Sequence, residues 1–342
     1  MTEHQFLQEL EMALHQLPTE ERNDIFQDIR EYFSNGRQDG KTDGEIAAEL
    51  GAPAEIAKEL ISSYDFGNVQ TAPRTVELSK DEFDKVDIQI DNGALDIGLS
   101  ADGKMHVEVE DKGYNQQLFV DILERTLVIT LKEEVKKWGI FSFTINTKSP
   151  KVTVQLPPKV YDSIKMITDN GKIEGADLES IVLTAKSDNG SIRFKEAKAA
   201  ELSIRSDNGA LKLDSSRVEK LKAKSDNGKI ELTDIFANQV RLQTDNGSIL
   251  MVNVEGKIES ESDNGKIMLT TASLDRDITL KTDNGGITVE IANEPSNVSI
   301  HAHRDYGKAK IFGVKSNHAV YGAGQHSVVL KTDNGSIDVK KS

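Results

Sequence analysis

The chain has 342 residues, a formal net charge of −15, 5% aromatic residues and no cysteine. The length allows two domains, and the scarcity of aromatic residues predicts an aliphatic core. The acidic balance argues against nucleic acid as a partner, because phosphate binding needs a basic face, and the lack of cysteine excludes disulfides and thiolate metal sites.

Residues 1–64 have the pattern of a small all-α domain. Apolar side chains recur at helical spacing from Phe6 to Leu17 and from Ile25 to Phe33. Thr42 and Glu45 form a capping box, and Gly51 is placed to end that helix. Residues 1–65 hold 5 Lys and Arg against 15 Asp and Glu, a net charge of −10, which argues against a DNA-reading helix-turn-helix. Two interpretations stay open: an acidic docking module, or a bundle with a solvated acidic face.

Three segments of this domain carry a resemblance: residues 6–10 (FLQEL), 17–22 (LPTEER) and 49–60 (ELGAPAEIAKEL). In them the chain resembles the helical signalling (HAAS) domain of Gram-positive envelope-associated proteins. The resemblance implies protein–protein interaction in a regulated envelope system, with a protein partner bound through the helical domain. The first residues lack the basic and apolar regions of a signal peptide, and no apolar run could span a membrane. These signals predict a cytoplasmic protein, with peripheral attachment to the membrane surface left open.

A short linker is expected at residues 65–75, and a β domain at 76–342. Its first part, 76–165, has strand patterns without clean repeats, and we expect irregular first coils that cap an open end. Within it, the segment 136–143 (KKWGIFSF) contains the only tryptophan. Trp138, Phe141 and Phe143 predict either a hairpin that contacts a membrane or protein, or a strand that plugs the end of the core.

One tripeptide, Asp-Asn-Gly, organises the rest of the chain. From Asp169 to Asp283 it recurs at steps of 19, 19, 19, 19, 18 and 20 residues, and a degenerate copy begins at Asp305. The copies are Asp91-Asn92-Gly93, Asp169-Asn170-Gly171, Asp188-Asn189-Gly190, Asp207-Asn208-Gly209, Asp226-Asn227-Gly228, Asp245-Asn246-Gly247, Asp263-Asn264-Gly265, Asp283-Asn284-Gly285 and Asp333-Asn334-Gly335. A fixed period of this length indicates a repeat architecture.

Alternating apolar residues flank each copy, which predicts two half-buried strands joined at a corner. Asn-Gly tolerates positive φ, and the Asp side chain can accept hydrogen bonds from backbone amides ahead of it. Antiparallel hairpins in a meander are one arrangement. The near-constant period favours the other, a mostly β chain wound as a right-handed single-stranded β-helix of about 19-residue coils over residues 166–342. The corners would then form a structural turn ladder.

Stacked carboxylates suggest two chemistries, a polysaccharide-active β-helix enzyme and a calcium site. Cations two residues before the Asp, such as Lys186, Arg205 and Lys224, predict a mixed-sign exterior ladder instead, and near-identical coils argue against one catalytic pair. The calcium-binding nonapeptide repeat is absent. We therefore expect the chain to have no enzymatic activity and to bind no metal and no cofactor.

The last repeats contain two further candidates. His301 and His303 share a strand face, where a surface pair is favoured over a zinc site. Residues 311–326, with Phe312 and Tyr321, predict a loop that could bind a partner.

The β domain resembles the putative-adhesin β-strand-repeat family of Lia-type cell-envelope stress systems. The resemblance rests on residues 152–157 (VTVQLP), the repeats themselves and residues 321–324 (YGAG). It implies a non-catalytic scaffold or interaction protein in the envelope stress response, with an envelope or membrane-surface ligand as a further partner. A surface adhesin is the main alternative, and the polysaccharide enzyme the lesser one.

Overall fold

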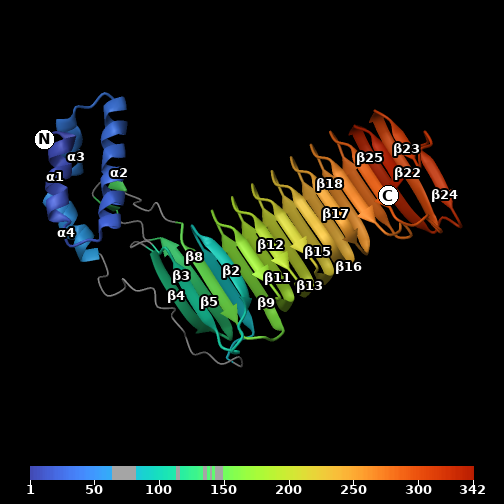
Figure 1. Cartoon of the computed structure of the whole chain (residues 1–342), viewed down its shortest axis with the longest axis horizontal. Coiled ribbons are helices and arrows are strands. Elements are labelled where there is room, and N and C mark those ends of the chain that lie inside the picture. The colour runs from blue at the N-terminus through green and yellow to red at the C-terminus, as the bar shows by residue number, and fades with distance from the viewer. Residues whose placement is uncertain (64–81, 113–115, 134–136, 139–140, 143–148) are drawn as a thin grey trace. The chain divides into compact units, whose positions relative to one another are not determined.

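The computed structural model of the protein describes residues 1–63, 82–112, 116–133, 137–138, 141–142 and 149–342 (Figure 1). The chain divides into two compact units, one that contains the helices and one that contains most of the strands. The linker predicted at residues 65–75 lies outside the described residues, so the predicted domain boundaries remain a prediction.

Four helices form the helical unit: α1 (Glu3–Ala13), α2 (Thr19–Gln38), α3 (Asp43–Leu50) and α4 (Pro53–Ser63). Their apolar faces meet in one buried cluster, as the helical spacing predicts. It consists of Phe6, Leu10, Leu14, Leu17, Ile25, Ile29, Phe33, Ile46, Ala47, Leu50, Ile56 and Ala57.

Local signals at the helix ends fix where these helices begin and end. The predicted capping box is present, since Thr42 Oγ1 accepts from the amide of Glu45 and the Glu45 carboxylate accepts from the amide of Thr42. Gly51 follows with φ of 90°. Thr2 and Gln5 form a second capping box at the start of α1, which the sequence analysis missed.

The strands form a solenoid with two parallel sheets. Each coil contributes one strand to each of the two sheets. In spatial order, sheet B contains β5 (Thr126–Glu133), β1 (Lys85–Ile90), β9 (Tyr161–Thr168), β11 (Glu179–Ser187), β13 (Lys198–Ser206), β15 (Arg217–Ser225), the second half of β16 (Ile230–Thr244), β18 (Lys257–Ser262), β20 (Ile278–Thr282), β25 (His326–Asn334) and β22 (Val298–Tyr306).

Sheet A contains, in the same direction, β3 (His106–Glu110), β8 (Lys151–Leu156), β2 (Ala94–Leu99), β10 (Ile173–Ala176), β12 (Ile192–Lys195), β14 (Leu211–Asp214), the first half of β16, β17 (Ile249–Val254), β19 (Ile267–Thr271), β21 (Ile287–Ile291), β26 (Ile337–Lys341) and β23 (Ala309–Ile311). Four strands remain: β4 (Gln116–Leu123), β6 (Lys137–Trp138), β7 (Phe141–Ser142) and β24 (His318–Tyr321).

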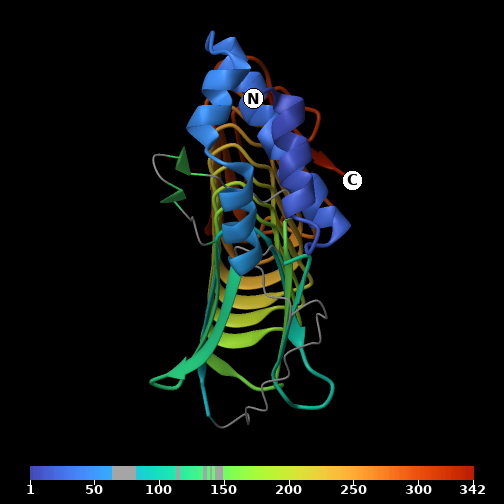
Figure 2. The same cartoon turned by 90° about the vertical axis from the view of Figure 1, so that its left-hand side faces the viewer.

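Equivalent residues of successive coils pair directly, so the predicted β-helix is confirmed and the meander is wrong. Leu202 of β13 pairs with Leu221 of β15, and Leu221 pairs with Val240 of β16. All three side chains are at most 2% exposed, and each buried residue of this size stabilises the fold by about 1.5–3 kcal/mol. In Figure 2 the corners of successive coils lie behind one another.

The first coils do not follow one another in chain order. Strand β1 lies between β5 and β9, and β2 lies between β8 and β10. The coil of β1 and β2 is therefore not at the end of the stack, because β5 and β8, and beyond β8 also β3, lie outside it although they follow it in sequence. The irregular first coils predicted for 76–165 remain a prediction, and the sequence analysis did not foresee this order of strands.

The other end has the same reversal. Strands β25 and β26 lie between the coil of β20 and β21 and the coil of β22 and β23. The last coil in sequence is therefore the penultimate coil in space. The segment 311–326, predicted as a loop, contains β24 (His318–Tyr321), which pairs antiparallel with β22 and covers the open edge of sheet B.

Candidate functional site

The corner of each coil is a four-residue unit, Ser or Thr followed by Asp-Asn-Gly. In a representative corner, Ser206 is fully buried and its hydroxyl donates to the carbonyl of Gly190 in the preceding coil at 2.9 Å. The same hydroxyl accepts from the amide of Gly209 at 2.8 Å. The serine, and not the aspartate as predicted, therefore satisfies the turn, because its short side chain points into the coil.

The asparagines form a continuous ladder along the outside of the corners. Each side-chain amide donates to the Asn side chain of the neighbouring coil at 2.6–3.0 Å, from Asn92 at one end to Asn334 at the other. Asn170 bonds to Asn92 although 78 residues separate them. Asparagine ladders of this kind stabilise stacked strands.

The glycines are required for close approach of backbones. A Cβ atom at Gly209 would lie 1.9 Å from the carbonyl oxygen of Gly190. Positive φ, expected at the Asn-Gly corners, is instead found at the opposite corner of the coils. There it occurs at Asp177, Glu196, Ser215, Asp234 and Asn253.

The aspartates of the corners form ion pairs at the surface. Lys186 donates to Asp188 at 2.9 Å, and this hydrogen bond raises the pKa of the lysine. Arg205 lies between Asp207 at 3.1 Å and Asp226 of the next coil at 3.8 Å. These carboxylates are 33–42% exposed and pair with cations of the same or a neighbouring coil, so the mixed-sign ladder is present.

The predicted aromatic candidates fall into two places. Strands β6 and β7 form a separate antiparallel hairpin in which Trp138 pairs with Phe141; the positions of their side chains, and all of Phe143, lie outside the described residues. Phe312 and Tyr321 meet edge to face with ring centroids 5.8 Å apart and pack against the core. These two rings therefore help close the solenoid end.

Three of the seven histidines, His301, His303 and His318, lie close together near the same end. His301 of β22 lies opposite His318 of β24 with ring centroids 4.5 Å apart, and its ring stacks parallel to that of His303 at 6.5 Å. The Ser299 hydroxyl lies within 3.2 Å of Nε2 of both His301 and His318. Among the described residues no cluster of three or more His, Asp or Glu is arranged to hold a metal ion.

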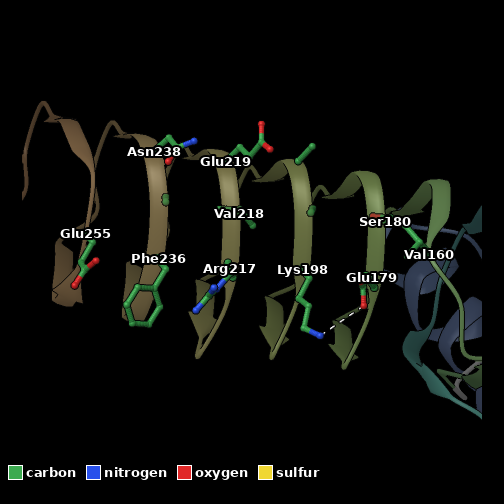
Figure 3. A pocket seen from close by; sticks show the side chains of 13 residues that line it. Val160, Glu179, Ser180, Lys198, Arg217, Val218, Glu219, Phe236, Asn238 and Glu255 are labelled. Atoms are coloured by element: carbon green, nitrogen blue, oxygen red, sulfur yellow. Dashed lines mark ion pairs between the residues drawn. The ribbon is translucent and has the colours of Figure 1, made fainter.

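A surface that the sequence analysis missed lies on the outer face of sheet B. A hollow of about 620 Å³ crosses the coils there, and two further hollows of about 370 and 320 Å³ continue along the same face. One side chain from each coil lies along its edge in file (Figure 3): Glu179, Lys198, Arg217, Phe236 and Glu255. We refer to the three hollows together as the sheet B groove.

The groove arises where sheet B bends. In each of these coils the ladder is interrupted at one residue without a change of register: Ser180 pairs with Ala199 and Val182 with Glu201, and the two consecutive residues Ile181 and Val182 face outward. Ile181 and Val182 are 52% and 37% exposed. A break in the alternation at Ser180-Ile181-Val182-Leu183 is the sequence signal that could have revealed this bend.

Residues 82–340 match the family model described as Toastrack DUF4097, and residues 5–59 match the HAAS model. The uncharacterized protein YvlB of Bacillus subtilis (strain 168) is 26% identical over 131 residues, which are 38% of this chain and 36% of YvlB. The match thus spans about a third of that relative.

Three solved structures are similar over 80% of the chain. They are a putative adhesin from Bacteroides fragilis (16% identity, 98% of that chain, TM-score 0.39), a putative lipid binding protein from Parabacteroides distasonis (12%, 98%, 0.47) and a putative adhesin from Parabacteroides merdae (12%, 97%, 0.42). No helix in the described part of the chain is both long and apolar enough to cross a bilayer.

Proposed function

We propose that this chain, which belongs to the Toastrack DUF4097 family and carries a HAAS domain, is a non-catalytic interaction protein of the cell-envelope stress response. The helical domain would bind a protein partner, and the solenoid would present a long side-chain surface to a second one. The observation that carries the proposal is the even distribution of the corner carboxylates. They repeat from coil to coil in exposed ion pairs, whereas a catalytic site gathers perturbed groups at one point.

A charge-reversal experiment tests the role of the helical domain in the full-length chain. Glu9 and Glu11 are exposed on α1, within residues 1–65, whose net charge is −10. We expect Glu9→Lys with Glu11→Lys to remove most of the partner recovered by cross-linking from cells under envelope stress. Asp121→Lys with Asp305→Lys, two exposed sites on the solenoid, is the charge-matched control. Equal recovery with both variants would contradict this division of labour.

The proposed location is the cytoplasm or the inner surface of the membrane. Fractionation of cells with and without envelope stress tests it. Recovery from the cell exterior alone would favour the alternative of a surface adhesin.

Catalysis on polysaccharides is tested at one corner. Asp226 is equivalent to the other corner aspartates, so an enzyme that used it would lose turnover in Asp226→Asn. We expect no turnover of acidic polysaccharides by the wild-type protein. Turnover that disappears in this variant would replace the interaction proposal with an enzymatic one.

A further inference from the structure

Pairing of β22 with β24 brings two imidazole rings together at the end of the solenoid. His301 of β22 lies directly opposite His318 of β24, and their ring centroids are 4.5 Å apart at an interplanar angle of 32°. The hydroxyl of Ser299 lies 3.0 Å from Nε2 of His301 and 3.2 Å from Nε2 of His318. Two ring nitrogens from different strands therefore point to the same hydroxyl.

The surroundings leave both nitrogens available to a ligand. His318 is exposed, and Ser299 and His301 are half-buried. On its other side, His301 has Val329 of β25 as its neighbour. Within the described part of the chain, the Ser299 hydroxyl is the side-chain hydrogen-bond partner of these two Nε2 atoms, and no carboxylate forms an ion pair with either ring. A solvent-accessible pair of imidazoles without a carboxylate partner suits a metal that binds nitrogen and completes its shell with water.

The spacing of the two rings fits a single zinc ion. Tetrahedral zinc lies about 2.0–2.1 Å from each imidazole nitrogen, which places two such nitrogens about 3.3 Å apart. Both Nε2 atoms already lie within 3.2 Å of one oxygen, so small rotations of the rings bring them to that separation. His303, the partner considered in the sequence analysis, stacks parallel to His301 with a wider centroid distance of 6.5 Å. The cross-strand pair is therefore the better placed of the two.

We propose that His301 and His318 bind a zinc ion through their Nε2 atoms, with water at the remaining coordination positions. The Ser299 hydroxyl would hydrogen-bond one of these waters, in place of the bonds that it makes to the rings. The sequence alone offers the corner carboxylates and the pair of His301 with His303, because His318 falls in a segment predicted as a loop. Only the pairing of β24 with β22 brings His318 to His301.

A zinc ion at this position would join the capping strand to the sheet that it covers. Strand β24 pairs antiparallel with β22 and covers the open edge of sheet B. Because both ligands are in place only while the two strands are paired, the ion stabilises the paired state by mass action. Binding of zinc here is independent of the interaction proposed above for the helical domain.

The test uses the full-length chain, freed of metal with a chelator and isotope-labelled in its seven histidines. Zinc chloride is the probe, and magnesium chloride, whose cation prefers oxygen ligands, is its control. NMR follows each histidine ring during the titration, and amide exchange is measured in β22. Two variants remove one ligand each, His301→Gln and His318→Gln. His303→Gln is the matched control, because it removes the ring that stacks beside His301 on the same strand.

We expect zinc, but not magnesium, to shift the ring signals of His301 and His318 in a saturable way and to slow amide exchange in β22. Each ligand variant should bind zinc at least about tenfold more weakly, and His303→Gln should bind within about threefold of wild type. The slower exchange in β22 should be absent from His318→Gln. An equal loss of affinity in His303→Gln, shifts spread evenly over all seven histidines, or no response to zinc would overturn the site.

Discussion

Gly285 lies at the corner between β20 and β21, directly against the carbonyl oxygen of Gly265 in the preceding coil. A Cβ atom at Gly285 would lie 2.1 Å from that oxygen, whereas one at the next residue, Gly286, would lie 3.4 Å from its nearest neighbour. We expect Gly285→Ala to lower the free energy of unfolding by about 3 kcal/mol or more, because two backbones must separate. Gly286→Ala should change it by less than about 1 kcal/mol. Urea unfolding of the two variants checks this prediction. Similar losses of unfolding free energy in both variants would contradict it.

Asp275 is the residue for which a pH effect can be predicted. Burial raises the pKa of its carboxyl, but hydrogen bonds from the amides of Asn297 and Ser296 and from the Ser296 hydroxyl outweigh burial and lower the pKa to about 2. Because the folded pKa lies below the usual value of 3.8, this stabilisation is present above pH 4 and is lost as pH falls towards 2.

The variant Asp275→Asn should therefore be less stable than wild type at pH 7 by about 1 kcal/mol, after allowance for solvent screening. The difference between the two proteins should shrink as the pH falls from 4 to 2. Parallel urea titrations at several pH values measure it. A gap that stays constant through this range would contradict the assignment.

At the level of the elements, one coil is an exchangeable unit. Removing residues 207–225 joins Ser206 to Asp226, which restores the Ser-Asp-Asn-Gly corner and leaves every column of the sheets in register. We expect this 19-residue deletion to fold with an unchanged far-UV circular dichroism shape and a modest loss of stability. Removing only residues 207–216 deletes β14 and joins Ser206 to Arg217, so the sheets cannot both continue. A folded product from the second deletion would contradict the coil as the unit of structure.

Sequence patterns were sufficient for the coils but not for their order. The period and the alternation around residues such as Leu202 and Leu221 specify stacked coils, because the apolar positions of every repeat indicate which face is buried. They do not specify that Asn92 stacks on Asn170, since that contact depends on the path of the chain between two residues 78 positions apart. The sheet B groove was missed for a related reason. The break in the alternation at Ile181 and Val182 is small in sequence, and the hollow forms only where several coils repeat it side by side.

On the scale of the whole solenoid, the exposed end is protected by β24. Its inner side chains, Ala319 and Tyr321, pack on the core, while Val320 is 53% exposed on the same strand. We expect Ala319→Asp with Tyr321→Asp to detach β24 and expose the edge of β22, which gives concentration-dependent association by light scattering and faster amide exchange in β22. Val320→Asp is the control and should remain as wild type. A monodisperse double variant with protected β22 amides would show that β24 is not needed as a cap.

The reversed coil order also bears on how the protein is made. A ribosome releases β22 and β23 before β25 and β26, yet the last two strands are the ones that connect the former to the rest of the stack. Coils up to β21 can assemble as they are synthesised, but the terminal coil must wait, without a neighbour, until about thirty more residues have emerged. A product of translation that stops before residue 326 lacks β25 and β26, the strands with which β22 and β23 pair. Folding of this end of the solenoid during synthesis therefore depends on the last strands of the chain.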